Sequence, residues 1–421
     1  MGLTLTNATL DGVAVGLRSE DGTIAALGPG VEAAPGDELI DGNGMALVPG
    51  FVNAHTHAAM TLFRGYADDL PLMEWLTKYI WPVEKQLDDE DIYWGARLAC
   101  AEMIRTGTTS FWDMYWRAEA TARAVEDAGV RAVAGSPLID DGDPAKSERA
   151  CADAERSLER VAEANGRLAQ PGFAPHAIYS LSERSLRWIA ERAKELEVPV
   201  QIHLSETEDE VKGSLADHGM RPAFYLDEIG MLGPRTVLAH GCWLDRSELE
   251  LIAERGATVV TNPVANLKLA VGRVFPYGEA RQVGIELGLG TDGPGSNNSL
   301  DVLASAKAFA LLQKERARDP AAVTAAETLE IATGRRSALL GGKGLTVGAP
   351  ADFLLVRSDD PELALGKLEA GLVYAASGPI VDTRVVAGRV LMRGGVVADQ
   401  AEVVARARER AARLGLTAAA A

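Results

Sequence analysis

Short β-branched runs alternate with longer, charged amphipathic segments from about residue 50 to residue 342, and this alternation constrains the fold more than any other feature. Such alternation is typical of repeated βα units, whose strands are parallel. Eight candidate strands lie at residues 46–54, 108–114, 131–138, 172–179, 198–204, 236–240, 258–261 and 285–290. Candidate helices lie at residues 91–105, 118–128, 147–164, 183–196 and 246–255. The pattern predicts an α/β fold with a (β/α)₈ TIM-type barrel over residues 50–343.

The two ends of the chain differ from the barrel segment. Residues 1–49 and 344–397 are rich in glycine, valine and short alternating runs, which are typical of antiparallel hairpins. Because the two flanks look alike, we expect them to form one small composite β-sandwich domain from both chain ends. Residues 398–421 are expected to form a C-terminal helix, at 402–416, and an alanine-rich tail.

Composition limits the possible partners. The chain has 421 residues, is 47% hydrophobic and carries a formal net charge of −18 without any block of lysine or arginine. This balance argues against nucleic acid and anionic membranes and favours a small-molecule substrate. Three scattered cysteines fit a reducing compartment, and there is no signal sequence or apolar run of membrane-spanning length. We therefore expect a cytoplasmic protein, and its surface leaves room for a homo-oligomer.

Five of the six histidines fall at the predicted carboxyl ends of barrel strands, where such barrels place their chemistry: His55, His57, His176, His203 and His240. His55 and His57 stand two residues apart in a strand, so their side chains share a face and suit chelation of one metal ion. A satisfied polar pair at a strand end is the alternative for this dyad taken alone.

A catalytic zinc takes about three protein ligands and leaves one position for water. His55, His57 and His203 offer neutral nitrogen, and Asp292 offers a carboxylate just past the last predicted strand. We expect one divalent metal ion per subunit, Zn²⁺ first and Fe²⁺ second. Such an ion lowers the pKa of a bound water towards neutrality.

Glu206 follows His203 by three residues and is the first choice for a proton shuttle. The alternative is a helix N-terminal carboxylate, grouped with Glu208 and Asp209 and stabilised by the helix dipole. His240 is expected to polarise the substrate or stabilise the attacking group, and Asp292 to share the role of base. A core histidine bonded to a backbone carbonyl is the alternative for His240.

These residues belong to a set of motifs that resembles the amidohydrolase superfamily, specifically its branch of S-adenosylhomocysteine/5'-methylthioadenosine deaminases and triazine hydrolases. The resemblance covers almost the entire chain. The motifs are PGFVNAHTH at 49–57, WPVE at 81–84, APHA at 174–177, HLSET at 203–207, LAHG at 238–241, NPVANLKL at 262–269, GTDG at 290–293 and SNN at 296–298.

The resemblance implies a mononuclear site that binds zinc or iron through His55, His57, His203 and Asp292. Relatives with two metals use a lysine on strand four, whereas residues 172–182 contain none and include His176 instead. The resemblance also implies that Glu84 binds the ribose hydroxyls, that His176 contacts substrate and that Glu206 bonds the purine ring. A solvated helix charge is the alternative for Glu84.

One departure concerns the substrate's tail. Family members that favour S-adenosylhomocysteine place an arginine soon after strand three, where this chain has Gly135, Ser136 and Pro137, and a second in the next loop, where Arg149 is the nearest match. Because arginine is the natural clamp for a carboxylate, its loss favours a smaller or uncharged 5'-substituent.

The leading hypothesis is hydrolytic deamination of an adenine nucleoside: 5'-methylthioadenosine, S-adenosylhomocysteine, 5'-deoxyadenosine or adenosine. Glu206 would protonate the ring nitrogen and then the leaving ammonia, while His240 and Asp292 steady the tetrahedral centre. Another aminated or chlorinated heterocycle, such as an s-triazine, guanine or a pterin, is the near alternative. Cyclic-amide hydrolysis and a non-catalytic metal-binding barrel are more distant ones.

Overall fold

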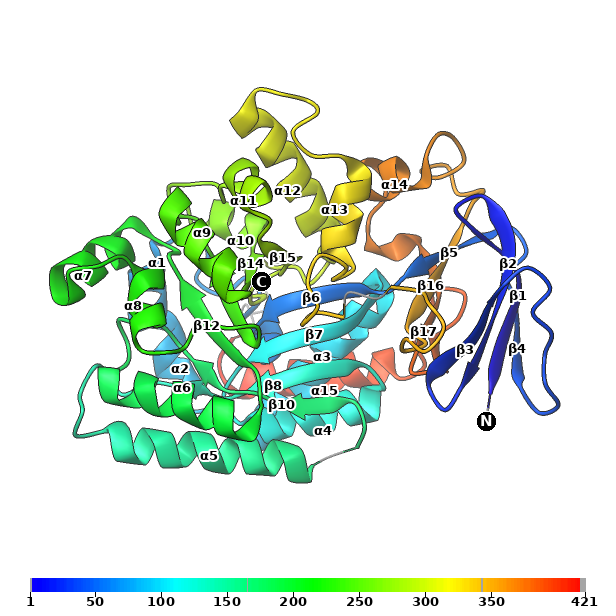
Figure 1. Ribbon diagram of the computed structural model, residues 1–421. Helices are drawn as coiled ribbons and strands as arrows, with labels where there is room; N and C mark the ends of the chain where they lie inside the picture. Colours follow the sequence, from blue (N-terminus) through cyan, green and yellow to red (C-terminus); the bar gives the residue numbers. More distant parts are fainter. Residues whose placement is uncertain (1, 165, 342–343, 417–421) are drawn as a thin grey trace.

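The computed structural model describes residues 2–164, 166–341 and 344–416. The βα units fill the left of Figure 1, and strands from both chain ends lie together at its right. The barrel strands are β6 (Phe51–Thr56), β7 (Thr108–Met114), β8 (Arg131–Gly135), β9 (Pro137–Leu138), β10 (Ala169–Pro171), β11 (Ala174–Pro175), β12 (Val200–Leu204), β13 (Thr236–His240), β14 (Thr258–Thr261) and β15 (Glu286–Leu289).

These strands form parallel sheets in the orders β10-β8-β7-β6, β11-β9 and β12-β13-β14-β15. Backbone hydrogen bonds also connect the sheets. The amides of Thr291 and Asp292 donate to the carbonyl of His55, joining the end of β15 to β6, and the amide of Gln201 on β12 donates to the carbonyl of Phe173 beside β11. His55 and Asp292 are therefore neighbours in space.

Helices of the βα units surround these strands (Figure 1). They are α3 (Asp89–Thr106), α4 (Ala118–Ala128), α5 (Ser147–Glu163), α6 (Glu183–Leu196), α7 (Glu208–His218), α8 (Pro222–Glu228), α9 (Arg246–Arg255), α10 (Pro263–Lys268), α11 (Tyr277–Val283), α12 (Val302–Ala317) and α13 (Ala325–Ala332). Their apolar faces enter a continuous core that includes Phe111, Ile189, Ile202 and Leu287.

Short helical segments occupy two stretches of the chain, one between β6 and α3 and one between β16 (Phe353–Arg357) and β17 (Val381–Val386). They are η1 (Ala58–Phe63), α1 (Leu72–Glu74), η2 (Trp75–Ile80), α2 (Trp81–Glu84), α14 (Leu368–Ala370), η3 (Gly371–Ala375) and η4 (Gly378–Ile380). The final helix, α15 (Gln400–Arg413), packs on α3. We call residues 72–84, which carry α1, η2 and α2, the pocket cover.

Strands from both chain ends share one eight-stranded sheet in the order β18-β17-β16-β5-β1-β2-β3, with β4 beside β1. Its members are β1 (Leu3–Leu10), β2 (Val13–Glu20), β3 (Thr23–Gly28), β4 (Glu38–Asp41), β5 (Met45–Pro49), β16 (Phe353–Arg357), β17 (Val381–Val386) and β18 (Arg389–Met392). The central pairing is antiparallel, between β5 from the first end and β16 from the second. The described chain contains no helix with both the length and the apolar character needed to cross a bilayer.

The first barrel strand differs from its expected extent. Residues 46–54 form two strands rather than one, because β5 pairs with β16 while β6 pairs with β7. The chain passes between these sheets at Gly50, where a Cβ atom would lie 2.1 Å from Oγ1 of Thr109. Only glycine fits such an approach without movement of its neighbour.

The segments expected at strands three and four are also interrupted. Residues 131–138 divide into β8 and β9, and the segment predicted at 172–179 contains only β11, while β10 precedes it. At Gly135 a Cβ atom would lie 2.6 Å from the carbonyl oxygen of Gly172. The close approach of two backbones at this point explains why regular pairing breaks there. The helix expected at 402–416 is α15, which begins and ends slightly earlier, and residues 417–421 of the predicted tail lie outside the described residues.

Candidate metal centre and substrate pocket

Strand ends bring the predicted ligands together at one end of the barrel. His55 lies in β6 and His57 directly follows it, His203 lies in β12, and Asp292 follows β15. Nε2 of His57 lies 3.1 Å from Oδ1 of Asp292, and Nε2 of His55 lies 3.7 Å from the same oxygen. The ring centroids of His55 and His203 are 4.9 Å apart. His55 therefore lies beside each of the other three predicted ligands.

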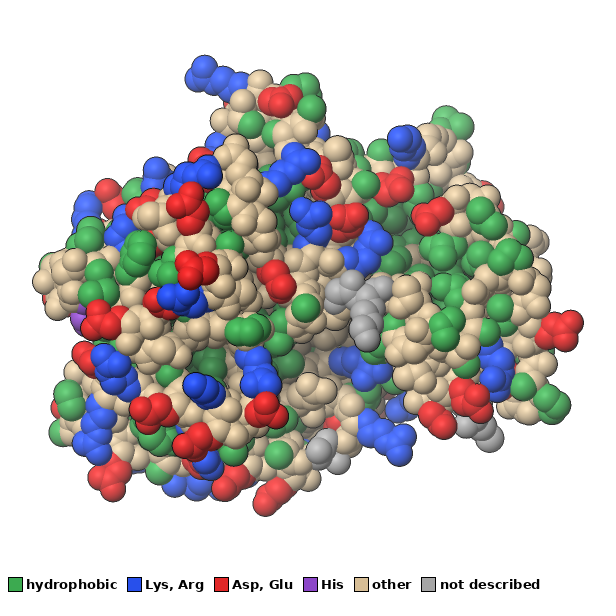
Figure 2. Space-filling model, in the orientation of Figure 1, with side chains coloured by type: hydrophobic (Ala, Val, Ile, Leu, Met, Phe, Trp, Pro, Cys, Tyr) green, Lys and Arg blue, Asp and Glu red, His purple; other side chains and the backbone are tan. Residues whose placement is uncertain are grey.

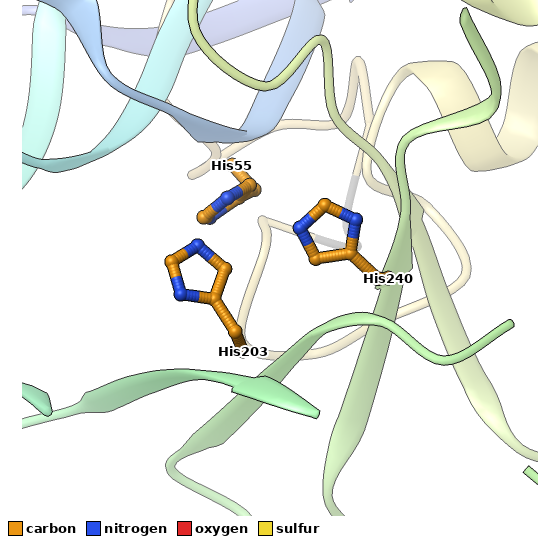
Figure 3. Close-up of side chains that lie close together, drawn as sticks. All are labelled: His55, His203 and His240. Carbon is orange, nitrogen blue, oxygen red and sulfur yellow. The ribbon is translucent and has the colours of Figure 1, made fainter. Parts of the chain in front are cut away.

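His240, the last residue of β13, belongs to the same cluster. Figure 3 shows the rings of His55, His203 and His240 directed towards one another from their strands. The atoms with which these three residues could ligate a metal lie within 4.8 Å of one another. The same is true of His55, His57 and Asp292. His55 is common to both groups, which places it at the centre of the cluster.

Hydrogen bonds fix the orientation of the three predicted histidine ligands. Nδ1 of His57 lies 2.6 Å from the carbonyl oxygen of Met114, and Nδ1 of His203 lies 2.8 Å from that of His176. A carbonyl only accepts, so both Nδ1 atoms donate, which leaves Nε2 of each ring to face the cluster. Partners of this kind commonly orient metal-bound histidines.

His55 is oriented by a side chain that we did not single out from the sequence. Its Nδ1 lies 3.1 Å from Oε1 of Gln201, and the amide group of Gln201 in turn donates to the carbonyl of Ala54 at 3.0 Å. Nε2 of His55 is buried and has no hydrogen-bond partner among the described residues. A buried nitrogen lone pair without a partner is costly unless a cation or donor meets it. The donor set therefore fits a divalent metal ion.

Burial and the contact between His57 and Asp292 set the charges of the cluster, and a bound cation would replace the proton that these two residues share. Burial lowers the pKa values of His55 and His203 well below normal, so both imidazoles are neutral and ready to ligate. Burial also lowers the pKa of His57, but the hydrogen bond to Asp292 outweighs it and raises that pKa to about 9. The same contact, acting against burial, holds the pKa of Asp292 below its usual range. Asp292 thus keeps the negative charge that a cation requires.

Asp292 itself is held by its own loop. Its backbone adopts a left-handed φ of +61°. Oδ1 accepts a hydrogen bond from the amide of Gly293 at 2.8 Å, and Oδ2 accepts one from the hydroxyl of Ser296 at 2.7 Å. These bonds aim the carboxylate at His55 and His57.

Glu206 faces the same cluster from the loop between β12 and α7. It stands before Thr207, whose side chain caps α7, so it is not one of the helix's first-turn carboxylates. Its Oε1 lies 3.7 Å from Nδ1 of His240, which also contacts Oδ1 of Asn266 at 2.8 Å. Burial raises the pKa of Glu206, while His240 acts in the opposite direction. A carboxylate with a raised pKa beside a metal site is suited to proton transfer.

A pocket opens above the cluster and reaches the pocket cover. The pocket is lined by the polar residues His57, Glu84, His176, His203, Glu206, His240 and Asp292 and by apolar residues of the pocket cover such as Trp75 and Ile80. Glu84, on α2, accepts hydrogen bonds from the hydroxyl of Tyr115 at 2.7 Å and from Nε1 of Trp116 at 3.1 Å. Burial raises its pKa in spite of these donors. Glu84 is therefore a pocket residue rather than a solvated helix charge.

His176 directly follows β11 and belongs to the pocket lining, with its ring centroid 4.9 Å from that of His203. Its Nδ1 lies 2.9 Å from Oγ of Ser180, and burial lowers its pKa to about 4. A neutral imidazole in this position can exchange a hydrogen bond with a bound molecule.

The structure does not bring Arg149 to the pocket. Arg149 lies on α5 with its side chain 91% exposed, and its nearest acid is Asp153 on the same helix, at 3.8 Å. Pro137 and Ile139, which follow β8, line the pocket wall instead. None of the described lining residues is a lysine or an arginine.

Tyr115, Trp116 and Gln201 contribute to the site but were not predicted from the sequence. A signal was present for Gln201, because residues two apart in a strand share a face and Gln201 precedes His203 by two. No comparable signal marked Tyr115 and Trp116, whose contact with Glu84 depends on how the pocket cover folds over β7.

Three imidazoles and a carboxylate at the carboxyl ends of parallel strands, with a buried acid beside them, define a metal-dependent hydrolase on a barrel scaffold. The family model described as the amidohydrolase family matches residues 46–391. The chain belongs to the amidohydrolase family, and it is a hydrolase that acts on carbon–nitrogen bonds.

Several known proteins are similar to this chain over most of its length. A 5'-deoxyadenosine deaminase from Methanoregula boonei is 47% identical over 379 residues, which cover 89% of this chain and 86% of the relative. A 5-methylthioadenosine/S-adenosylhomocysteine deaminase from Archaeoglobus fulgidus is 42% identical, covering 91% of this chain and 92% of its own. The crystal structure of an adenosine deaminase from Xanthomonas campestris with bound zinc has a TM-score of 0.91 and 34% identity, with 99% of both chains covered. Together with the family match, the Xanthomonas campestris structure implies a TIM-barrel fold for this chain.

Proposed function

We propose that this chain is a metal-dependent deaminase of adenine nucleosides, which releases ammonia and leaves an inosine-type nucleoside. The observation that carries the proposal is the arrangement along one pocket. The histidine and Asp292 cluster, Glu206 and Glu84 all line this pocket, and Glu84 belongs to the pocket cover rather than to a barrel strand. A purine ring directed at the cluster would thereby place its ribose near Glu84. The names of the relatives from Methanoregula boonei and Archaeoglobus fulgidus support the same substrate class.

Each residue then has a defined task. His55, His57, His203 and Asp292 would hold one divalent ion, zinc in the first place, which supplies a Lewis acid that lowers the pKa of water. Glu206 accepts one proton of the attacking water and delivers it to the ring nitrogen. It then carries the second proton, from the hydroxyl group on the tetrahedral carbon, to the amine, which leaves as ammonia. His240, held by Asn266 on one side, stabilises the charge that develops at the tetrahedral carbon.

The outer part of the pocket positions the nucleoside. Glu84 accepts hydrogen bonds from Tyr115 and Trp116, and these fix its carboxylate where it can also accept from ribose hydroxyls. His176 contacts the substrate between Glu84 and the metal ligands. Precise placement of the reacting carbon contributes much of the rate in such reactions.

The 5'-substituent is small or apolar in this proposal. Pro137, Ile139 and Trp116 line the wall after β8 and β7, and no described lining residue offers a cation for the carboxylate of a homocysteine tail. An unpaired carboxylate in such a pocket would pay a desolvation cost. We therefore infer that 5'-deoxyadenosine and 5'-methylthioadenosine are preferred over S-adenosylhomocysteine.

A comparison of kcat/KM across substrates tests this choice. Purified, metal-loaded protein is assayed for ammonia release from 5'-deoxyadenosine, 5'-methylthioadenosine, adenosine, S-adenosylhomocysteine, guanine, a pterin and an s-triazine. We expect the first two to exceed S-adenosylhomocysteine by about 10-fold or more, the size of a lost charge-assisted bond. Turnover of a heterocycle without ribose, and of no nucleoside, would replace the proposal with the alternative substrate class.

Two variants sharpen that comparison. Ile139→Arg places a guanidinium on the pocket wall and should shift the preference towards S-adenosylhomocysteine. Arg149→Ala is the matched control, because Arg149 lies on the outer surface and its removal should leave every ratio unchanged.

Several broader features are part of the same proposal. The chain divides into a composite sandwich domain at residues 1–49 and 344–397, a catalytic barrel at 50–343 and a C-terminal segment at 398–421. The shared eight-stranded sheet supports the first of these units. A cytoplasmic location fits the nucleoside substrates, and a homo-oligomer is a further possibility that sizing in solution tests.

A further inference from the structure

Glu210 lies behind Glu206 and has not been given a role above. Glu210 stands in the first turn of α7 and is only 6% exposed. Its Oε1 accepts a hydrogen bond from the backbone amide of Ser205 at 2.7 Å, and its Oε2 accepts one from the amide of Glu206 at 2.9 Å. One carboxylate thus binds two consecutive amides of the loop that carries Glu206.

This loop has an unusual conformation that needs support. Ser205 adopts a left-handed φ of +49°, which is uncommon for a residue other than glycine. The carbonyls of Leu204 and Ser205 accept hydrogen bonds from the amides of Gly241 and Trp243. The loop is buried, so its two amides would lack partners if Glu210 were absent.

A second buried glutamate shows what a purely structural role looks like. Glu248 also accepts backbone amide bonds, but it completes the capping box of α9 and forms an ion pair with Arg221 at 2.7 Å. Among the described residues no lysine or arginine pairs with Glu210, and burial raises its pKa to about 7. A buried carboxylate without a cation is costly to keep.

We propose that Glu210 is a positioning residue for proton transfer: it holds the backbone of Ser205 and Glu206 so that the Glu206 carboxylate faces the reacting centre. This inference rests on the proposed role of Glu206 as proton shuttle. Glu210 itself touches neither substrate nor metal in this account.

Glu210→Gln is the direct test, because the amide keeps one acceptor oxygen and turns an NH₂ group towards a backbone N–H. We expect kcat to fall by about 10- to 100-fold, a part of the roughly 100- to 10,000-fold that general acid–base catalysis supplies. KM and metal content should stay within about 3-fold of wild type, since the pocket and ligands are untouched. Glu208→Gln is the matched control on the same turn. Glu208 is exposed and paired with Lys212, so this variant should retain wild-type kcat.

A double-mutant cycle with Glu206→Gln separates positioning from general stabilisation. If Glu210 acts through Glu206, adding Glu210→Gln to Glu206→Gln lowers kcat by less than about 2-fold. Multiplicative losses in the double variant would overturn the inference, as would a single Glu210→Gln variant with unchanged kcat. Glu210→Asp, which keeps the charge but has a shorter reach, should show an intermediate kcat and serves in the cycle if Glu210→Gln does not fold.

Amide hydrogen exchange supplies a readout that needs no activity. The peptide containing residues 204–207 should exchange faster in Glu210→Gln than in wild type, with Glu208→Gln unchanged. Unaltered exchange there would contradict the inference alone. A wild-type protein that deaminates no nucleoside would instead remove the proposed function and leave the exchange result standing.

Discussion

The orientation of His55 depends on one neutral side chain, Gln201, which in turn bonds to the carbonyl of Ala54. Replacing Gln201 with alanine leaves Nδ1 of His55 without its acceptor, so the ring can rotate or change tautomer. We expect metal affinity to fall by about 10- to 100-fold, the usual effect of losing such a partner. Metal content after dialysis against a chelator measures this. Gln170→Ala, an exposed site on β10, should behave as wild type, and equal metal retention in both variants would contradict the argument.

Glu206 should set the acid limb of the pH–rate profile. It must be ionised to accept a proton from water, and burial raises its pKa above the ordinary value of 4.5. Activity therefore falls as the pH drops through a value higher than 4.5, and this limb disappears in Glu206→Gln together with most of the activity. A profile of kcat/KM between pH 4 and 9, as a practical range, tests this. An acid limb that persists unchanged in the variant would assign it to another group.

At the scale of elements, the junction between β5 and β6 is tightly packed. Gly50→Ala would place a Cβ atom 2.1 Å from Oγ1 of Thr109, so neighbouring backbone must move. We expect a loss of about 1 to 3 kcal/mol in the free energy of unfolding, as for other overpacked sites. Denaturant titration measures the change.

Gly213→Ala is the matched control for this substitution. Gly213 lies within α7 and does not have a left-handed backbone. A Cβ atom added there would have no neighbour within 4 Å outside its own helix backbone. Alanine there should add up to about 1 kcal/mol of stability because it favours the helix. Equal effects at the two glycines would show that the junction is not tightly packed.

Elements with strong local signals were predictable from the sequence. The helices α4, α6 and α9 have the expected bounds, since amphipathic spacing and clear end residues define them locally. The division of the first strand at Gly50 was not predictable from the sequence, because it depends on pairing with β16, which lies some 300 residues later in the chain. Repeated βα units predicted the barrel for a general reason: the connections leave few other arrangements.

The candidate site shows the same division. The ligand cluster was predictable because each member stands at a strand's carboxyl end, a position that the barrel brings to one face. The positions of Arg149 and Glu210 were not predictable, because the first depends on a loop path and the second on a turn with a left-handed residue. Such features follow from tertiary contacts rather than from local sequence.

For the whole molecule, charge is distributed rather than concentrated: Figure 2 shows acidic and basic side chains interspersed over the visible face. The chain's C-terminal region nevertheless reaches the pocket cover. Ala407 and Leu414 of the α15 region pack in one cluster with Trp75 and Ile80, and Arg413 bonds to Asp91 at the start of α3. The last helix thus packs on α3 and η1 and shares an apolar cluster with the cover.

Deleting residues 400–421 should therefore affect both stability and binding. Loss of buried side chains such as Val403 and Leu414 should cost on the order of 3 kcal/mol, and the loosened cover should raise KM more than it lowers kcat. Thermal unfolding and steady-state kinetics test the two effects. Arg408→Ala, at an exposed site of α15, should change neither. A truncated enzyme with the wild-type KM would show that the pocket cover does not depend on α15.

The most direct test of the account is product stoichiometry with 5'-deoxyadenosine. Protein stripped of metal and then loaded with zinc is incubated with the nucleoside, and ammonia, the purine product and bound metal are measured together. We expect one ammonia and one inosine-type nucleoside per nucleoside consumed, with activity rising to a maximum at one zinc per chain. Release of free adenine, or full deamination by the metal-free protein, would contradict it.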